Sequence, residues 1–254
     1  MHRILLLFFL AVFAATGRTE SDLAQVHAAR ELLGPDIWAQ AIRVENTGRH
    51  HRYPAQTYAL VFEFEGILWL YTPYDGTQSF SIYRGRLAQD RQDFGPLLRE
   101  IEPGFERHEV LPEEPAATAT APRSKPANAC FIASLAALRA KVASGEVTRA
   151  ALLSYYYDAG GRYGHTVLTY ETRAGHFVLD PARSDQPEAV SAGMVRDAVR
   201  LASAIQREHR IAQARLLPVD LAKLTTTTID TAEPLYSDSG LGFAPVGQEF
   251  CAPP

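Results

Sequence analysis

A cysteine, a histidine and an aspartate that could together carry out acyl transfer follow one another along the second half of the chain. Cys130 comes just after Asn128 and opens the run FIASLAALRAKV. Apolar residues recur in this run at helical spacing, at Phe131, Leu135, Leu138 and Val142. The spacing predicts a helix with Asn128 as its N-cap and Gly145 as its stop. Cys130 then lies in the first turn, where free backbone N–H groups and the helix dipole stabilise a thiolate.

The histidine and the aspartate lie on two strand-like runs that predict a β-hairpin. His165 opens HTVLTY, and Asp180 closes HFVLD after a turn near Arg173-Ala174. With an even-numbered turn, Asp180 falls opposite Val167 and shares a sheet face with His165. An odd-numbered turn would place the two side chains on opposite faces. The even register therefore predicts an imidazole beside a carboxylate.

These three residue types have complementary roles in nucleophilic catalysis. Cys130 is the expected nucleophile, and His165 is the base that takes its proton. Asp180 is expected to hold the imidazole in one tautomer and to stabilise its cationic form.

The order Cys, His, Asp and the hairpin GHTVLTY … FVLDP resemble the papain-like and transglutaminase-like cysteine hydrolase superfamily. Within it, the hairpin is most similar to bacterial transglutaminase-like proteins and bacteriocin-processing-type peptidases, and the resemblance covers residues 126–185. It implies a papain-like domain in which a helix packs on an antiparallel sheet, a cysteine thioester intermediate, and a peptide or protein substrate. Papain-like enzymes also place an oxyanion-binding Gln before the cysteine. The segment before Cys130 has none, so Asn128 or the backbone N–H of Cys130 is the candidate donor.

Other interpretations of the same residues stay open. Cys130 and Cys251, the two cysteines of the chain, could form a disulfide in an oxidising compartment. The domain would then be a non-catalytic binding or assembly module on the same fold. His165 could be a buried strand histidine without a catalytic role, and His176 either supports Asp180 or is an exposed strand residue. The run Tyr155-Tyr156-Tyr157 fits a substrate cleft or aromatic core packing equally well.

The chain divides into five segments. An apolar run at 4–15 behind Arg3 predicts a signal peptide over residues 1–17, and hence export to the periplasm or beyond the cell. Residues 20–111 are expected to form a small α+β domain, and the proline-rich stretch 112–127 a linker. Residues 128–224 form the predicted hydrolase domain, and 225–254 an irregular tail.

The expected elements make the fold class α+β. A helix is predicted over 21–33, followed by strands over 38–45, 57–63, 67–72, 79–84 and 105–111 and a short helix near 94–101. The second unit is expected to be a helix, a hairpin and a second helical stretch near 187–215. Within that stretch, arginines at 196, 200, 207 and 210 suggest a solvated basic face.

Composition narrows the class of protein. With 254 residues and 46% hydrophobic content, the chain can bury a sizeable core. A net charge of −4 provides no basic field for nucleic acid. Two cysteines are too few for a Cys-rich zinc site, and His50-His51 lacks further ligands at convincing spacing, so no metal is expected. No phosphate-binding glycine loop is visible, so no cofactor is expected either. After signal cleavage the protein is not expected to be an integral membrane protein.

Overall fold

The protein has an α+β fold built mainly from two antiparallel sheets. The structure is a computed structural model, and its described residues are 22–46, 54–65, 67–74, 76–79, 95, 98–99, 104–112, 125–159 and 162–225. Several predicted features lie outside these residues. They are the signal peptide 1–17, most of the strand 79–84, His50-His51, most of the linker 112–127 and nearly all of the tail 225–254.

The first sheet comes from the N-terminal segment and has the strand order β4-β3-β2-β1-β5. Its strands are β1 (Ala39–Asn46), β2 (Gln56–Phe64), β3 (Ile67–Thr72), β4 (Gly76–Ser79) and β5 (Phe105–Val110). Residues 22–33 before it are helical, as predicted. The pair Phe64↔Ile67 closes the β2–β3 hairpin, and Glu65 takes a positive φ of 54° in the two-residue turn. The strands predicted over 38–45, 57–63, 67–72 and 105–111 are thereby confirmed within one or two residues.

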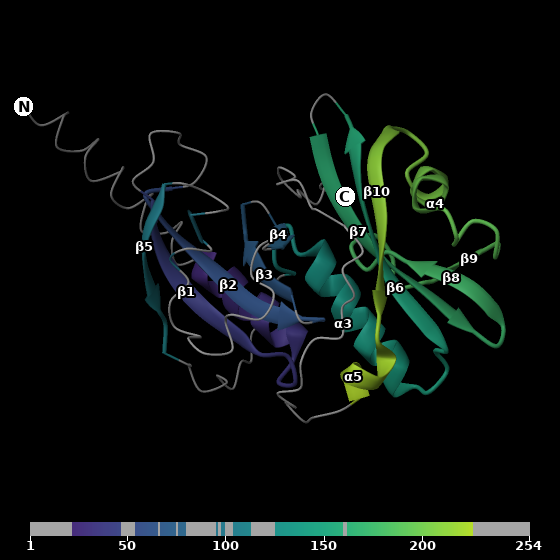
Figure 1. Cartoon of the computed structure of the whole chain (residues 1–254), viewed down its shortest axis with the longest axis horizontal. Helices are drawn as coiled ribbons and strands as arrows, with labels where there is room; N and C mark the ends of the chain where they lie inside the picture. The colour runs from purple at the N-terminus through teal and green to yellow at the C-terminus, as the bar shows by residue number, and fades with distance from the viewer. Residues whose placement is uncertain are drawn as a thin grey trace, which may run out of the picture.

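The second sheet comes from the C-terminal segment and has the order β10-β6-β7-β8-β9. Its strands are β6 (Arg149–Asp158), β7 (Arg162–Thr172), β8 (Gly175–Leu179), β9 (Glu188–Val190) and β10 (Arg210–Val219). Three labelled helices accompany it, namely α3 (Cys130–Ala143), α4 (Ala198–Ile205) and α5 (Leu221–Thr225). Figure 1 shows α3 between the two sheets, with α4 beside β10 on the outer side of the second sheet.

The helix predicted near 187–215 is wrong over most of its length. Only 198–205 is helical, and residues 210–219 form β10 along the edge of β6. Alanine, glutamine, arginine and leucine in this run favour a helix locally. Pairing with the whole of β6 satisfies the backbone and packs Ile211, Ala214 and Leu216 against the sheet, so tertiary contacts override local propensity. Of the four arginines, Arg200 alone lies within α4.

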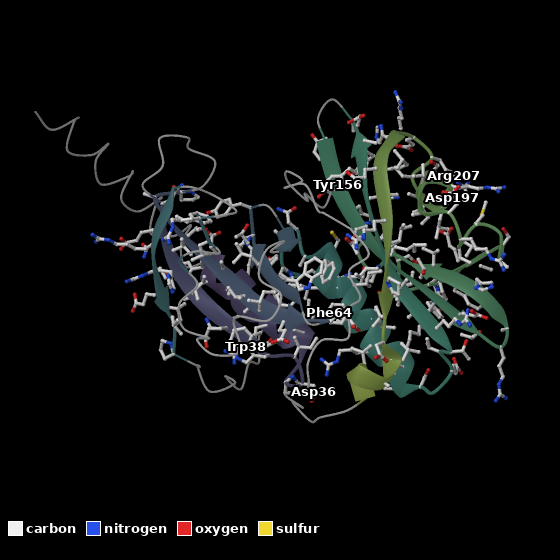
Figure 2. The ribbon with its side chains drawn as sticks, viewed as in Figure 1. Asp36, Trp38, Phe64, Tyr156, Asp197 and Arg207 are labelled. Atoms are coloured by element: carbon white, nitrogen blue, oxygen red, sulfur yellow. The ribbon has the colours of Figure 1, made fainter. Side chains whose placement is uncertain are left out.

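A single hydrophobic core joins the two sheets across α3. It contains Phe62, Phe64 and Trp69 of the first sheet together with Leu152 and Leu168 of the second. Phe131 of α3 lies 4.4 Å from Trp69 and 6.2 Å from both Phe62 and Phe64, measured between ring centroids. Figure 2 shows Phe64 on the side of the first sheet that faces α3. The segments expected to be two domains therefore have separate sheets but share one core.

The second sheet carries a different cluster on each face because side chains alternate along its strands. Leu152 and Leu168 point toward α3, whereas Leu153, Tyr155 and Val167 belong to the cluster that α4 covers with Leu201 and Ala202. This parity decides on which face each candidate site residue lies.

Candidate functional site

The β7–β8 hairpin places His165 and Asp180 on one face of the second sheet. Thr172 pairs with Gly175 across a two-residue turn, and Leu168 pairs with Leu179. The Thr172 hydroxyl accepts a hydrogen bond from the Ala174 N–H at 3.0 Å within the turn. Because the turn is even-numbered, the register continues to Asp180 opposite Val167, diagonal to His165. The predicted hairpin register is confirmed.

The two side chains form a close hydrogen-bonded pair. His165 Nε2 lies 2.7 Å from Asp180 Oδ2, and the side chains are 4% and 12% exposed. Asp180 Oδ1 also accepts a hydrogen bond from the Ala182 N–H at 3.1 Å, and Arg183 Nε lies 3.4 Å from Oδ2. The backbone and a guanidinium thus fix the carboxylate that orients the imidazole.

The other nitrogen of the imidazole is buried without a partner. A carboxylate accepts hydrogen bonds, so in the neutral ring Nε2 carries the proton and Nδ1 keeps its lone pair. His165 Nδ1 has no hydrogen-bond partner. A buried polar atom of this kind is uncommon and marks a candidate functional position. The arrangement supplies a basic nitrogen at Nδ1.

A second buried polar atom without a partner lies next to His165. Tyr155 pairs directly with His165 across β6 and β7, and its ring meets the imidazole edge-on at 5.7 Å. Its hydroxyl has no hydrogen-bond partner either. Burial, and then the negative charge of Asp180, raise the pKa of Tyr155 above its usual value near 10, so its hydroxyl stays protonated. Tyr155 is not distinguishable within the tyrosine run from the sequence, because its position opposite His165 requires the β6–β7 register.

Cys130 is the first residue of α3 and is 4% exposed. One turn further on, the Ser134 hydroxyl donates to the carbonyl of Thr166 in β7 at 3.0 Å. Lys141 lies over the ring of Tyr170, 5.9 Å from its centroid, so α3 and β7 run in the same direction. The four-residue step from Ser134 back to Cys130 covers about 6 Å along the helix, and two residues of β7 cover about the same length. Cys130 therefore lies near the level of Gly164 and His165.

At this level β7 is not paired with β8. β8 pairs with β7 only from Leu168 onward. His165 projects from the face that α4 covers, whereas the core residues of α3 pack on the other face. The structure therefore places Cys130 and the His165 side chain at a similar level of β7 but toward opposite faces of the second sheet.

The sulfur of Cys130 is not a free thiol. Cys130 is disulfide-bonded, and Cys251, which lies outside the described residues, is the only other cysteine in the sequence. The disulfide alternative of the sequence analysis thus applies to this state of the protein. In a disulfide the sulfur cannot act as a nucleophile, because the thiolate is the attacking species.

Asn128 differs from the prediction in two ways. The N-cap position is Ala129, which provides no side-chain cap, and Asn128 precedes it with a positive φ of 54°. The Asn128 Nδ2 atom donates to the carbonyls of Pro73 and Tyr74, at 2.7 and 3.2 Å. Both amide hydrogens are thereby used, so the side chain has no N–H left for an oxyanion. The backbone N–H of Cys130 remains the sequence-predicted donor.

The segment before Cys130 is held by the first sheet and by the helix over 22–33. Tyr71 donates to the carbonyl of Ala127 at 2.7 Å, and the Ala127 N–H donates to Gln25 at 3.0 Å. With the Asn128 contacts, these bonds fix the start of α3 from the N-terminal side. The N-terminal segment therefore helps to position Cys130, which the sequence analysis did not anticipate.

His176 does not support Asp180. It lies at the turn end of β8, where its Nδ1 is 3.9 Å from Glu171, and the two side chains are 24% and 35% exposed. Four strand residues, or about 13 Å, separate His176 from Asp180. His176 is half-buried on its strand, so it is neither a support for Asp180 nor a fully exposed residue.

Within the described ranges, no group of three or more histidine, cysteine, aspartate or glutamate side chains could hold a metal ion. None of the helices in those ranges is both long enough and apolar enough to cross a membrane. Comparison of the chain with protein-family models, with curated proteins and with solved structures finds no match.

Proposed function

We propose that the protein is a thiol hydrolase or acyltransferase that forms a thioester between Cys130 and an amide or ester acyl group. The observation that carries the proposal is the buried pair of His165 and Asp180, in which Nε2 is hydrogen-bonded and Nδ1 is unpartnered. In this proposal the reduced Cys130 thiol reaches Nδ1 past the segment of β7 that β8 does not pair with. A peptide or protein is the proposed substrate class, and export is the proposed location.

Each residue has a role that follows from its contacts. His165 Nδ1 takes the proton of the Cys130 thiol, and the free N–H groups in the first turn of α3 stabilise the thiolate. The thiolate attacks the acyl carbon, and the imidazolium returns its proton to the leaving group. Asp180 holds the ring and stabilises its positive charge. The backbone N–H of Cys130 is the proposed donor to the oxyanion.

The experiment measures the reactivity of Cys130 after reduction. Reduced protein is treated with iodoacetamide near pH 6, and the alkylation rate at Cys130 is followed by peptide mass, because Cys251 is also free after reduction. Replacing the base in His165→Ala should slow alkylation of Cys130 on the order of 100-fold, since positioned proton transfer contributes at least that much. Asp180→Asn should slow it in the same direction.

The hairpin offers a matched control. His176 also lies near a carboxylate, but it is half-buried at the far end of the hairpin, so His176→Ala should leave the alkylation rate unchanged. Transfer of an acetyl group from p-nitrophenyl acetate to Cys130, and its absence in Cys130→Ser, then tests for the thioester. An alkylation rate unaffected by His165→Ala would remove the proposed base.

A second candidate is favoured by the disulfide at Cys130. A non-catalytic binding or assembly module in an oxidising compartment could use the same bond as a structural crosslink. This candidate predicts that reduced Cys130 reacts with iodoacetamide no faster than an ordinary buried thiol.

A further inference from the structure

We infer that Tyr155, His165 and Arg183 form a binding site for a small carboxylate, which is taken up together with one proton from the solvent. Tyr155 and His165 are direct cross-strand neighbours and project from the face of the second sheet that α4 covers. The site therefore needs no contribution from Cys130 and goes beyond the proposed thioester chemistry. Two unpartnered polar atoms and the charges around them carry the inference.

The phenol of Tyr155 and the imidazole of His165 are adjacent but not hydrogen-bonded to each other. Tyr155 is 1% exposed, and its ring meets the imidazole edge-on. The phenol O–H is a donor and the Nδ1 lone pair an acceptor, yet both atoms are without a partner. Two such buried atoms have a desolvation cost, because neither bonds to protein or to bulk water. A ligand that bonds to both would recover this cost.

The next tyrosine on the same face has its hydroxyl satisfied within the protein. Tyr157 lies two residues beyond Tyr155 on β6 and is also buried. Its hydroxyl is hydrogen-bonded to the side chain of Gln206, which is buried too. The unpartnered hydroxyl is therefore a property of the position beside His165 and not of every buried tyrosine on this face.

The charges around these atoms indicate the class of ligand. The carboxylate of Asp180 already bonds to His165 Nε2 and to the Ala182 N–H, and it lies 3.4 Å from Arg183 Nε. Its charge is thus matched by Arg183 and is not left for a cationic ligand. Arg183 is 46% exposed, and its charge acts on the Tyr155 hydroxyl, so an anion can contact it from the solvent. A guanidinium has five N–H donors, which leaves donors for a ligand.

Charge balance requires a proton to enter with the anion. While His165 is neutral, the charges of Asp180 and Arg183 cancel, so a carboxylate alone would add an unmatched charge at a buried site. A proton on His165 Nδ1 restores neutrality and turns the lone pair into an N–H donor. The carboxylate then accepts hydrogen bonds from Nδ1 and from the Tyr155 hydroxyl. Phosphate, mostly a dianion near neutral pH, would carry a second charge that these groups do not match.

Other elements around His165 also contribute titratable groups. From α4 the cluster receives the apolar side chains of Leu201 and Ala202. The titratable and charged side chains on this side of the sheet are those of Tyr155, Tyr157, Tyr163, Asp180, Arg183 and His209. His209 stacks on Tyr157 and is thus one ring further from the imidazole. The tyrosines stay neutral at neutral pH, so Asp180 and Arg183 set the charge that His165 meets.

The test follows the ring nitrogens of His165 in the unreduced full chain, prepared with isotope-labelled histidine. Cys130 is disulfide-bonded in this form, so the readout does not depend on a free thiol. Sodium acetate is titrated at slightly alkaline pH against sodium chloride of equal ionic strength. Nuclear magnetic resonance distinguishes a neutral from a protonated Nδ1, and the signals missing in His165→Ala are those of His165.

We expect acetate, but not chloride, to shift His165 Nδ1 toward its protonated position. Acetate binding should also weaken by about tenfold for each pH unit over the range in which free His165 is neutral, since one proton is taken up with each acetate. Tyr155→Phe should weaken binding by about tenfold or more, because it removes a hydrogen bond to a charged group. Arg183→Gln should weaken it by up to about fivefold, because a half-exposed charge is screened by solvent.

Tyr157→Phe is the matched control, because the hydroxyl that it removes is bonded to Gln206. It should leave acetate binding unchanged, and far-UV circular dichroism checks that each variant is folded. Equal shifts with acetate and chloride would mean screening rather than binding and would overturn the site. Acetate binding without protonation of Nδ1 would overturn the uptake of a proton, and equal losses in Tyr155→Phe and Tyr157→Phe would remove Tyr155 from the site.

Discussion

The start of α3 and the Tyr155–His165 pair differ in how their polar groups are bonded. On the side of the first sheet, Tyr71, Asn128 and Ala127 all have hydrogen-bond partners that hold the start of the helix. In the second sheet, the Tyr155 hydroxyl and His165 Nδ1 are buried next to each other without partners, whereas the first sheet has one such atom among its described residues, Thr57 Oγ1. Folding alone favours satisfied polar groups, because each unsatisfied one has a desolvation cost. The contacts at the start of α3 therefore act as a support, and the adjacent unpartnered atoms of Tyr155 and His165 mark the candidate site.

The largest predicted effect is on the free energy of unfolding, and it tests whether the two sheets unfold together as one cooperative unit. Phe131→Ala should lower the free energy of unfolding by about 3–5 kcal/mol, because it removes a buried ring between the two sheets. Both tryptophans, Trp38 and Trp69, belong to the N-terminal segment, so fluorescence reports on that side. Hydrogen exchange of β7 amides reports on the other.

With a shared core, the two probes should give one unfolding transition that shifts as a whole in Phe131→Ala. Val199→Ala, at an exposed position of α4, is the control and should change stability little. Two separate transitions, with only the fluorescence transition shifted, would show that the sheets are independent domains.

A smaller effect is predicted for the support on the first side. Asn128→Ala removes two hydrogen bonds to backbone carbonyls and places alanine at a positive φ. We expect a loss of about 3–4 kcal/mol in urea unfolding, from about 1 kcal/mol for each of the two bonds and about 1–2 kcal/mol for the left-handed conformation.

Asn128→Gly separates the two causes, because glycine tolerates the positive φ but makes no side-chain hydrogen bonds. It should be destabilised less than Asn128→Ala. A loss below about 0.5 kcal/mol in both variants would mean that the amide does not anchor the start of α3.

The smallest predicted effect contrasts two buried tyrosines. Tyr71→Phe removes a hydroxyl that is hydrogen-bonded to Ala127, so it should destabilise the protein by about 1 kcal/mol. Tyr155→Phe removes a hydroxyl without a partner, so it should be neutral or stabilising by up to about 1 kcal/mol. Thermal unfolding of the two variants at neutral pH measures the difference, and a loss of stability in Tyr155→Phe would show that this hydroxyl has a partner.

Local sequence signals were sufficient for the hairpins. The run between Thr172 and Gly175 leaves room for a two-residue turn, and alternation along the strands then fixes which residues share a face with His165. The strands predicted over 57–63 and 67–72 are likewise adjacent in the sequence, and they pair as β2 and β3. In both places the strands are close in sequence, so few pairing registers compete.

Local sequence patterns gave wrong or incomplete predictions where contacts between distant residues determine the structure. Residues 210–219 have helix-forming composition but complete the sheet beside β6. Asn128 has the side chain of an N-cap, yet it donates to a turn more than 50 residues earlier, with a sequence separation of 55 to Pro73. Tyr155 could not be separated from its neighbouring tyrosines until the β6–β7 register was known.

The sequence by itself determined the candidate chemistry of this protein, because the types and order of Cys130, His165 and Asp180, and the parity of one hairpin, are local properties. The tertiary structure decided whether the sulfur of Cys130 is free, which atoms of His165 have partners, and which residues hold the start of α3. It places Cys130 in a disulfide, leaves His165 Nδ1 unpartnered, and uses the first sheet to hold the start of α3. These features depend on contacts between residues far apart in the chain, which composition and periodicity do not encode.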